Sequence, residues 1–348
     1  MSRKVFLWLG PFALAGLVSF GVTPTEAGAQ TSASGTARAT AKKPAAKKPV
    51  YSAKRAQSRR ARLARARAAA MAREMADTAL PRYKVDGSGD LVPDLRAAAG
   101  IIYDPDTNQV LWEENSQSQR SIASITKVMT AIVFLEDYPD LTKEVVIARA
   151  DVYRASTTFL RRNDRVTTGD LLHLLLIASD NAAARALERV SPYGSEGFID
   201  RMNEKADELG LEATNYADTS GLLSENLSSA YDMARLIGHA SQDERISAIM
   251  RMPEYTISGK RKITVRSTNY LVRNGDYDVR AGKTGFISKA GYCLATVLRL
   301  PQTGQNVAVV VFGARSNAGR FLESRNLFNW VSTKASTLFG TKTETQQQ

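Results

Sequence analysis

Apolar and polar residues alternate over several short stretches of this chain, which is the pattern of half-buried β-strands. Residues 97–103 and 110–113 predict a hairpin that turns over 104–109. Later in the chain the same kind of pattern predicts further strands, at residues 255–257, 262–266, 277–281, 291–300 and 307–313.

The residues between these two groups of strands favour helices. We expect one helix from Ser124 to about Glu136, and mainly helices from about Thr168 to Met250. A final helix is predicted over residues 319–338. Strands, a helical middle, more strands and a last helix indicate an α+β fold, in which helices pack on an antiparallel sheet.

The first 29 residues have the pattern of an export signal. Arg3 and Lys4 precede an apolar run from residue 5 to about 22, and Ala27-Gly28-Ala29 has the small-residue spacing of a cleavage site. An uncleaved anchor is the alternative, because about 18 apolar residues approach a membrane span. Pro11 and three glycines interrupt the run, which favours cleavage.

The net charge of +12 is concentrated in one segment. Residues 38–73 carry 13 Lys or Arg and no acid, whereas residues 74–348 carry 32 basic and 34 acidic side chains. Because the basic segment lacks large apolar residues, we expect 30–88 to be a flexible linker, transiently helical over part of 53–75. It is either a solvated spacer or a weak tether to anionic envelope polymers or lipid headgroups. An exported chain rarely meets nucleic acid, so we expect no nucleic-acid partner.

We expect one folded domain over residues 89–340 and a frayed tail over 341–348. Cys293 is the only cysteine, which excludes an internal disulfide, and its apolar neighbours predict a buried thiol. The two histidines, His173 and His239, lack the spacing of a zinc peptidase. We therefore expect no metal and no other cofactor.

Three short motifs carry the candidate chemistry. In chain order they are Ser124-Ile125-Thr126-Lys127, Ser179-Asp180-Asn181 and Lys283-Thr284-Gly285, the three-part signature of penicillin-type serine acyl-enzymes. Each also has a purely structural interpretation. Ser124 suits a helix N-cap, the second motif suits the cap of a helix over residues 182–190, and the third motif suits a turn at the end of a strand. Their shared order favours the catalytic interpretation.

The chemistry explains the residue types. A serine hydroxyl needs a neighbouring base to remove its proton, and residues i and i+3 of a helix lie on one face, which places Lys127 beside Ser124. An ordinary lysine is protonated at neutral pH, but burial and a second cation lower its pKa. Lys283 is the candidate second cation. Ser179 and Asn181 supply a hydroxyl and an amide to relay a proton, to hold Lys127 and to bind the substrate. We assign Lys127 as the base, although the identity of the base in this mechanistic class is disputed.

At these motifs the sequence resembles the low-molecular-mass penicillin-binding proteins, which are D-alanyl-D-alanine peptidases, and most of all the DD-endopeptidases of the penicillin-binding protein 7 type. The resemblance runs from about Leu91 to about Val331. Besides the motifs it includes residues 121–123, 171–184, 219–222, Asn226, Ser228 and 290–294. It implies the penicillin-binding/β-lactamase-like serine transpeptidase fold, with a five-stranded antiparallel sheet flanked by helices.

By position, the resemblance implies roles for the site residues. The catalytic set is Ser124, Lys127, Ser179, Asn181 and Lys283, and the substrate-binding set is Thr284, Gly285 and Phe286. The backbone N–H groups of Ser124 and Phe286 would form the oxyanion hole. One departure is the run Arg161-Arg162-Asn163-Asp164, where relatives often place a glycine turn.

The implied reaction is attack by Ser124 on a D-alanine carbonyl in a peptidoglycan cross-link, with β-lactam antibiotics as inhibitors. About 60 residues follow Gly285, too few for the second domain that carboxypeptidase relatives often append, so the endopeptidase is favoured. A D-alanyl-D-alanine carboxypeptidase is the alternative. A β-lactamase is disfavoured because the segment from Glu212 to Asn215 is one residue shorter than the required E-x-x-x-N element. A non-catalytic envelope-binding scaffold would not need the intact motifs. We expect a bacterial periplasmic or cell-envelope protein, soluble or peripherally bound.

Overall fold

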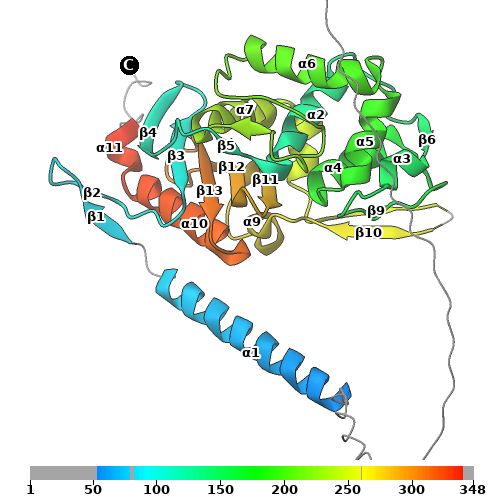
Figure 1. Cartoon of the computed structure of the whole chain (residues 1–348). Helices are drawn as coiled ribbons and strands as arrows, with labels where there is room; N and C mark the ends of the chain where they lie inside the picture. The colour runs from blue at the N-terminus through cyan, green and yellow to red at the C-terminus, as the bar shows by residue number, and fades with distance from the viewer. Residues whose placement is uncertain (1–52, 79–81, 260, 340–348) are drawn as a thin grey trace, which may run out of the picture. The chain divides into compact units, whose positions relative to one another are not determined.

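A central sheet is formed by strands rich in buried, β-branched residues. The computed structural model describes residues 53–78, 82–259 and 261–339. The five strands of this sheet are β3 (Ala99–Asp104), β4 (Gln109–Glu114), β11 (Val279–Ile287), β12 (Gly291–Arg299) and β13 (Asn306–Ala314). They are antiparallel in the order β11-β12-β13-β3-β4, so β11 is an edge strand (Figure 1). The predicted early hairpin and the last two predicted strands are confirmed, whereas the strand predicted over residues 277–281 lies instead at Val279–Ile287.

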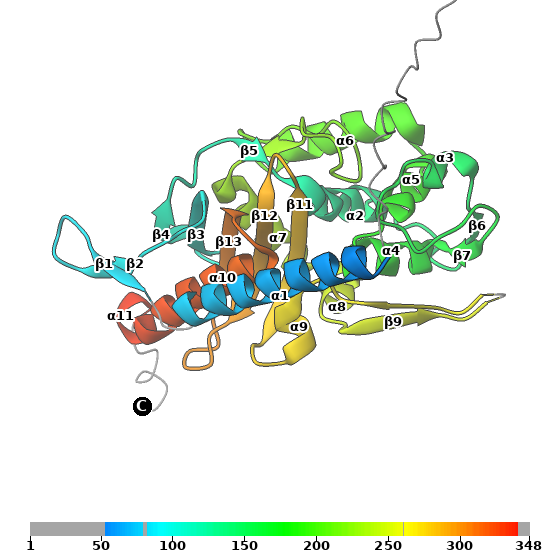
Figure 2. The same ribbon diagram turned by 60° about the horizontal axis from the view of Figure 1, so that its bottom comes forward.

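Helices cover both faces of the sheet (Figures 1 and 2). One core joins Ile101, Val310 and their neighbours on one sheet face to the helices of the middle of the chain. The other joins Ile102, Val309 and the opposite face to the last helices. The first group of helices is α2 (Lys127–Leu135), α3 (Arg149–Val152), α4 (Thr168–Ile177), α5 (Asn181–Val190), α6 (Gly194–Glu208), α7 (Ala230–Gln242) and α8 (Glu244–Met250). The second is α9 (Tyr270–Asn274), α10 (Asn317–Thr333) and α11 (Ala335–Phe339).

Four small two-stranded ladders connect these layers. They pair β1 (Tyr83–Val85) with β2 (Leu91–Pro93), β5 (Arg120–Ser121) with β8 (Leu227–Ser228), β6 (Glu144–Val146) with β7 (Arg165–Thr167), and β9 (Glu254–Ile257) with β10 (Ile263–Arg266). The β9–β10 hairpin confirms two further predicted strands. It projects from the end of the molecule that carries α3, α4 and α5 (Figure 1).

Two predicted helices differ in detail. The helix expected to start at Ser124 begins instead as a 3₁₀ turn, η1 (Ala123–Thr126), which continues as α2. The predicted last helix is divided at Lys334 into α10 and α11. Asn163 has a φ of 69°, a left-handed conformation that asparagine tolerates better than most residues. This asparagine makes the turn for which a glycine was expected.

The basic segment contains a helix where part of residues 53–75 was expected to be transiently helical. Residues 53–78 form one helix, α1 (Ala53–Thr78), because alanine and arginine favour helix and few residues oppose it. Arg82 forms an ion pair of 2.8 Å with Glu323 of α10, and β1 pairs with β2. These contacts move the start of the folded domain from residue 89 to about residue 82.

Some expectations lie outside the described residues, namely the export signal, the linker up to residue 52 and the tail 341–348. Within the described ranges, no helix combines the length and the apolar character that a bilayer span requires. Cys293 is buried, and burial raises the pKa of its thiol to about 11.

Candidate active site

The first motif occupies the 3₁₀ turn and the start of α2. Side chains at i and i+3 eclipse one another in a 3₁₀ helix, and Lys127 Nζ lies 3.2 Å from Ser124 Oγ. Lys127 is fully buried, whereas Ser124 is partly exposed. The N-cap interpretation of Ser124 is wrong, since Ile122 and Thr126 are the residues at the cap positions of η1 and α2. The predicted pair therefore has the geometry of a nucleophile facing a buried base.

The second motif lies in the loop between α4 and α5. Asp180 is the N-cap of α5, so the capping interpretation holds for the aspartate and leaves Ser179 available. Ser179 has a φ of 58°, a strained conformation for a residue with a Cβ atom. Asn181 Oδ1 accepts a hydrogen bond of 2.6 Å from Lys127 Nζ. The amide thereby holds the lysine, as the sequence predicted.

The third motif lies inside the edge strand β11, which rules out a turn at the end of a strand. Lys283 Nζ donates to Ser179 Oγ at 2.9 Å and to the carbonyl oxygen of Thr284 at 3.0 Å. Thr284 Oγ1 donates to Thr268 Oγ1 at 2.7 Å. All three motifs are therefore connected, through Ser179 and through Lys127.

Two glycines allow this close packing. A Cβ atom on Gly285 would lie 2.7 Å from the carbonyl oxygen of Ile122, so β11 packs directly on η1. A Cβ atom on Gly221 would lie 2.0 Å from the carbonyl oxygen of Ala123, and Gly221 has a φ of +76°. Any larger residue at either position would push its segment away from the nucleophile.

The sequence did not predict the role of the loop around Gly221. The carbonyl oxygen of Ser220 accepts a short hydrogen bond from Lys127 Nζ. Asp218 holds this loop by accepting bonds of 2.7 Å from the Gly221 N–H and from Asn226 Nδ2. An aspartate three residues before a glycine is a turn signal that points to this geometry, although not to its contact with Lys127.

A second group that the sequence missed is Arg320 on α10. Its guanidinium is buried and donates to the carbonyl oxygens of Gly285 at 3.0 Å and Cys293 at 3.2 Å. Burial lowers its pKa to about 10. Because the Gly285 carbonyl belongs to the peptide group that also carries the Phe286 N–H, Arg320 fixes the orientation of that peptide. No local pattern distinguishes an arginine that bonds a distant strand from a surface arginine.

Burial sets the charge state of the two lysines. It lowers the pKa of Lys127 to about 7, against the opposing effect of the Asp218 and Asp180 carboxylates. Burial also lowers the pKa of Lys283 well below its usual value, and the Lys127 and Arg320 cations lower it further. A second cation was predicted to lower the pKa of Lys127, with Lys283 as the candidate. Burial has the larger effect on this pKa, and the cation that lowers it further is Arg185.

The surroundings of Lys127 Nζ serve both charge states of the amine, because the three oxygen atoms of Ser124, Asn181 and Ser220 match the three N–H bonds of the ammonium form. A neutral amine has two N–H bonds and one lone pair. The oxygen atoms of Asn181 and Ser220 can only accept, so the two N–H bonds serve them. The lone pair is then left for the hydroxyl hydrogen of Ser124. The arrangement can therefore remove a proton from the nucleophile.

Two side chains that the sequence singled out, Phe286 and Glu212, are both exposed. Phe286 is 48% exposed, and its ring stacks on Tyr292 with 4.2 Å between the ring centroids. Glu212, from the weak β-lactamase element, is exposed, and the Asn215 side chain donates to the carbonyl of Glu225. Among the described residues, no group of three or more His, Cys, Asp or Glu side chains is placed to hold a metal ion.

These features define a serine acyl-transfer site on an α+β domain: a partly exposed serine faces a buried lysine of lowered pKa, and the other two motifs converge on this pair. The chain belongs to the D-alanyl-D-alanine carboxypeptidase family of serine peptidases, whose profile matches residues 87–316. It is therefore a serine DD-peptidase, a hydrolase.

The chain is similar to relatives named as endopeptidases and to a relative named as a carboxypeptidase. It is 35% identical over 227 residues to the D-alanyl-D-alanine endopeptidase of Haemophilus influenzae, covering 64% of this chain and 78% of that protein. The endopeptidase of Escherichia coli is 32% identical over 252 residues, covering 69% and 79%. The D-alanyl-D-alanine carboxypeptidase DacF of Bacillus subtilis is 28% identical over 249 residues, covering 69% and 63%.

The fold also matches solved structures. The crystal structure of the Streptomyces K15 DD-transpeptidase superimposes with a TM-score of 0.64 at 26% identity, covering 68% of this chain and 97% of that one. The predicted family and the predicted penicillin-binding fold, with its five-stranded sheet, are confirmed.

Proposed function

We propose that this protein is a DD-endopeptidase that hydrolyses D-alanyl peptide bonds in peptidoglycan cross-links through an acyl-enzyme on Ser124. The observation that carries the proposal is the 3.2 Å approach of Lys127 Nζ to Ser124 Oγ inside a buried cage of acceptors. The endopeptidase assignment is supported by the two endopeptidase relatives, which are more similar to this chain than the carboxypeptidase relative is.

Acylation begins with neutral Lys127. Its lone pair takes the proton of the Ser124 hydroxyl while Oγ attacks the carbonyl carbon of D-alanine. The developing oxyanion accepts hydrogen bonds from the backbone N–H groups of Ser124 and Phe286. Ser179, bonded to Lys283 at 2.9 Å, donates its hydroxyl proton to the departing amine and regains a proton from the Lys127 ammonium, which returns Lys127 to its neutral form. The C–N bond breaks, and the acyl group remains as an ester on Ser124.

Deacylation repeats the sequence with water as the nucleophile. A base takes a proton from the water, which attacks the ester carbonyl, and Ser124 leaves with its proton restored. When Ser124 opens a β-lactam ring, the amine remains attached to the acyl group and stays in the site, where a peptide substrate would have released its amine. β-Lactam antibiotics should therefore inhibit the enzyme as substrate mimics.

Substrate positioning falls to β11. Thr284 presents a hydroxyl that already bonds Thr268, and Gly285 lets β11 pack directly against η1, which brings the strand next to Ser124. The exposed ring of Phe286 offers an apolar surface at the rim of the site. These groups form the proposed substrate-binding set.

Labelling with a fluorescent penicillin tests the acyl-enzyme. Wild type should label strongly, and Ser124→Ala and Lys127→Ala should label weakly or not at all. Lys143→Ala, which changes an exposed lysine, is the matched control and should label normally. A wild type that fails to label would support a non-catalytic scaffold instead.

Substrate choice needs a second assay. Purified protein should convert cross-linked muropeptide dimers to monomers. Loss of D-alanine from monomeric pentapeptides, with dimers left intact, would establish the carboxypeptidase instead. Rapid turnover of a chromogenic cephalosporin would establish a β-lactamase.

We also propose that residues 1–29 direct export to the periplasm or cell envelope, and that the basic segment tethers the enzyme weakly to anionic envelope polymers. The tether predicts that chains with residues 30–81 sediment with isolated cell walls at low salt but not at high salt. Chains that start at residue 82 should not sediment under either condition.

A further inference from the structure

One margin of the active site carries basic side chains that no acid neutralises. We define the basic rim as Arg154, Arg161, Arg162 and Lys262, all of them exposed. Among the described residues, none of these four side chains forms a salt bridge. Arg154 only packs over the ring of Tyr153, at 5.3 Å.

The acids of this region are already engaged. Asp151 pairs with Arg189, Glu144 with Arg165, and Asp164 with Arg261. These carboxylates are therefore paired with arginines outside the basic rim, and the basic rim keeps an uncompensated positive charge. Since residues 74–348 are nearly neutral as a whole, this local excess does not follow from composition.

Hydrogen bonds place the basic rim beside the catalytic motifs. Asn181 donates its backbone N–H to the carbonyl of Thr157 at 2.9 Å and its side-chain amide to the carbonyl of Ala155 at 2.6 Å. Residues 155–157 therefore form the wall of the site next to the second motif. Arg154 precedes this wall directly.

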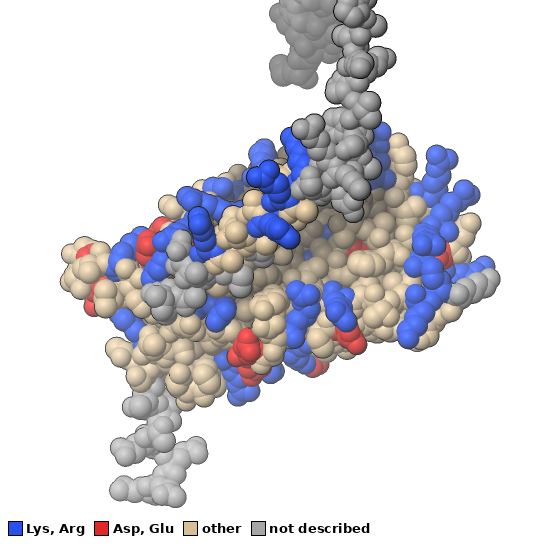
Figure 3. Space-filling model, turned by 90° about the horizontal axis from the view of Figure 1, so that it is seen from below, with Lys and Arg blue, Asp and Glu red and all other residues tan. Residues whose placement is uncertain are grey.

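The other members are joined to the residues that follow this wall in the chain. Arg261, next to Lys262 in the β9–β10 hairpin, donates to the carbonyl of Phe159 at 2.7 Å. The hairpin and the loop with Arg161 and Arg162 therefore lie together. Figure 3 shows Lys and Arg gathered at the end of the molecule where this hairpin lies, with little acidic surface among them.

Apolar surface accompanies the charge. Tyr153 is 56% exposed and Phe159 is 42% exposed, although both lie in the loop that packs on the site. A surface of cations and aromatic rings suits a peptide ligand that carries carboxylates along an extended backbone.

We propose that the basic rim binds the carboxylates of the second stem peptide of cross-linked peptidoglycan, and so favours cross-linked over monomeric substrates. This inference rests on the proposed function. An enzyme that cuts a cross-link must hold a stem peptide on each side of the scissile bond, whereas a terminal D-alanine offers only its own methyl group and carboxylate beyond that bond. Peptidoglycan stems carry free carboxyl groups, which are the natural ligands of arginine and lysine.

Charge reversal tests the proposal. The variant Arg162→Glu with Lys262→Glu changes two members of the basic rim and no residue that touches the proposed reacting atoms. The control Arg299→Glu with Arg325→Glu makes the same change in charge at two exposed arginines of β12 and α10. Each is assayed for hydrolysis of a purified muropeptide dimer, hydrolysis of a synthetic N-acyl-D-alanyl-D-alanine, and acylation by fluorescent penicillin.

The rim variant should lose about tenfold in kcat/KM on the dimer, about 1.4 kcal/mol, mostly through KM. Its penicillin acylation and its rate on the small peptide should match wild type, and the control should match wild type throughout. High salt should reduce the difference in kcat/KM on the dimer between wild type and the rim variant, because the Debye screening length falls to about 3 Å at 1 M salt.

Wild-type kcat/KM on the dimer in the rim variant would overturn the proposal, as would an equal loss on all three substrates. Binding of the basic rim to anionic lipid vesicles, with dimer hydrolysis unchanged by charge reversal, would assign it to a membrane surface and also overturn it. Failure of wild type to react with penicillin would instead overturn the proposed function, so the two failures are distinguishable.

Discussion

The rate at which penicillin acylates Ser124 should depend on pH through Lys127. The base must be neutral, and burial lowers its pKa from 10.5 to about 7. The neutral fraction is then about one half at pH 7, about one tenth at pH 6 and about one hundredth at pH 5. The acylation rate should therefore rise about tenfold from pH 5 to pH 6 and about fivefold from pH 6 to pH 7, and level off above pH 8.

The magnitude follows from the burial of one amine. A shift from 10.5 to about 7 corresponds to roughly 5 kcal/mol of lost stabilisation of the ammonium form, at about 1.36 kcal/mol per pKa unit. An unshifted lysine would be neutral in less than about 0.1% of molecules at pH 7. Burial thus increases the population of the active form by about a thousandfold.

A charge change nearby should move the midpoint in a known direction. Arg185 lowers the pKa of Lys127 by repulsion between cations. Arg185→Gln removes that charge, so the midpoint should move to higher pH. Arg185→Lys keeps the charge, and its midpoint should stay close to that of wild type.

Stopped-flow acylation with a fluorescent penicillin from pH 5 to pH 9 measures the profile, because the penicillin carboxylate stays ionised over this range. A rate that does not change between pH 5 and pH 8, or a midpoint at pH 9 or above, would refute Lys127 as the base. A downward shift in Arg185→Gln would refute the electrostatic reasoning.

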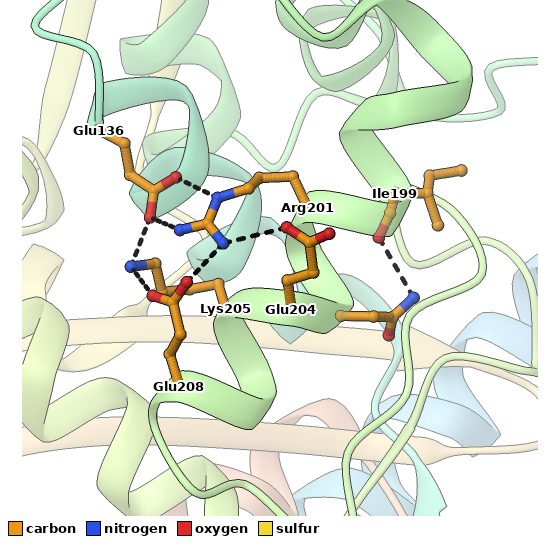
Figure 4. A network of polar contacts seen from close by, with 7 residues as sticks. Glu136, Ile199, Arg201, Glu204, Lys205 and Glu208 are labelled. Atoms are coloured by element: carbon orange, nitrogen blue, oxygen red, sulfur yellow. Dashed lines mark hydrogen bonds and ion pairs between the residues drawn. The ribbon is translucent and has the colours of Figure 1, made fainter.

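Two further predictions concern packing. Gly221→Ala should abolish penicillin labelling, because the added Cβ atom would lie 2.0 Å from the Ala123 carbonyl oxygen. The control Gly87→Ala should label normally, because no atom lies within 4 Å of the added Cβ atom. Full labelling of the Gly221→Ala variant would contradict the packing argument. Arg201→Ala should lower the melting temperature by about 3–8 °C with acylation unchanged, because this arginine joins α2 to α6 through two bonds of 2.8 Å to Glu136 and others to Glu204 and Glu208 (Figure 4). Arg251→Ala, which breaks one exposed pair with Glu244, should have a smaller effect, and equal shifts in the two variants would show that the network adds nothing.

Local patterns predicted the elements because strand alternation and helix spacing depend on near neighbours. They failed where distant contacts decide. The expected helix at Ser124 starts as a 3₁₀ turn that β11 and the Gly221 loop pack against. Part of the basic segment forms α1 although its composition indicated flexibility. Its high helix propensity favours a helix, whereas its low apolar content favours a flexible chain.

The sequence alone determined the chemical groups of the site and their order along the chain, because motif identity is a property of residue types. Only the tertiary structure decided that these groups meet, since Asn181 lies 54 residues from Lys127, and Lys283 lies 104 residues from Ser179. It also decided the burial that lowers the pKa of Lys127 and the bond from Arg320 to Gly285. A pKa depends on the solvent and charges that surround a group, and those surroundings exist only once the chain has packed.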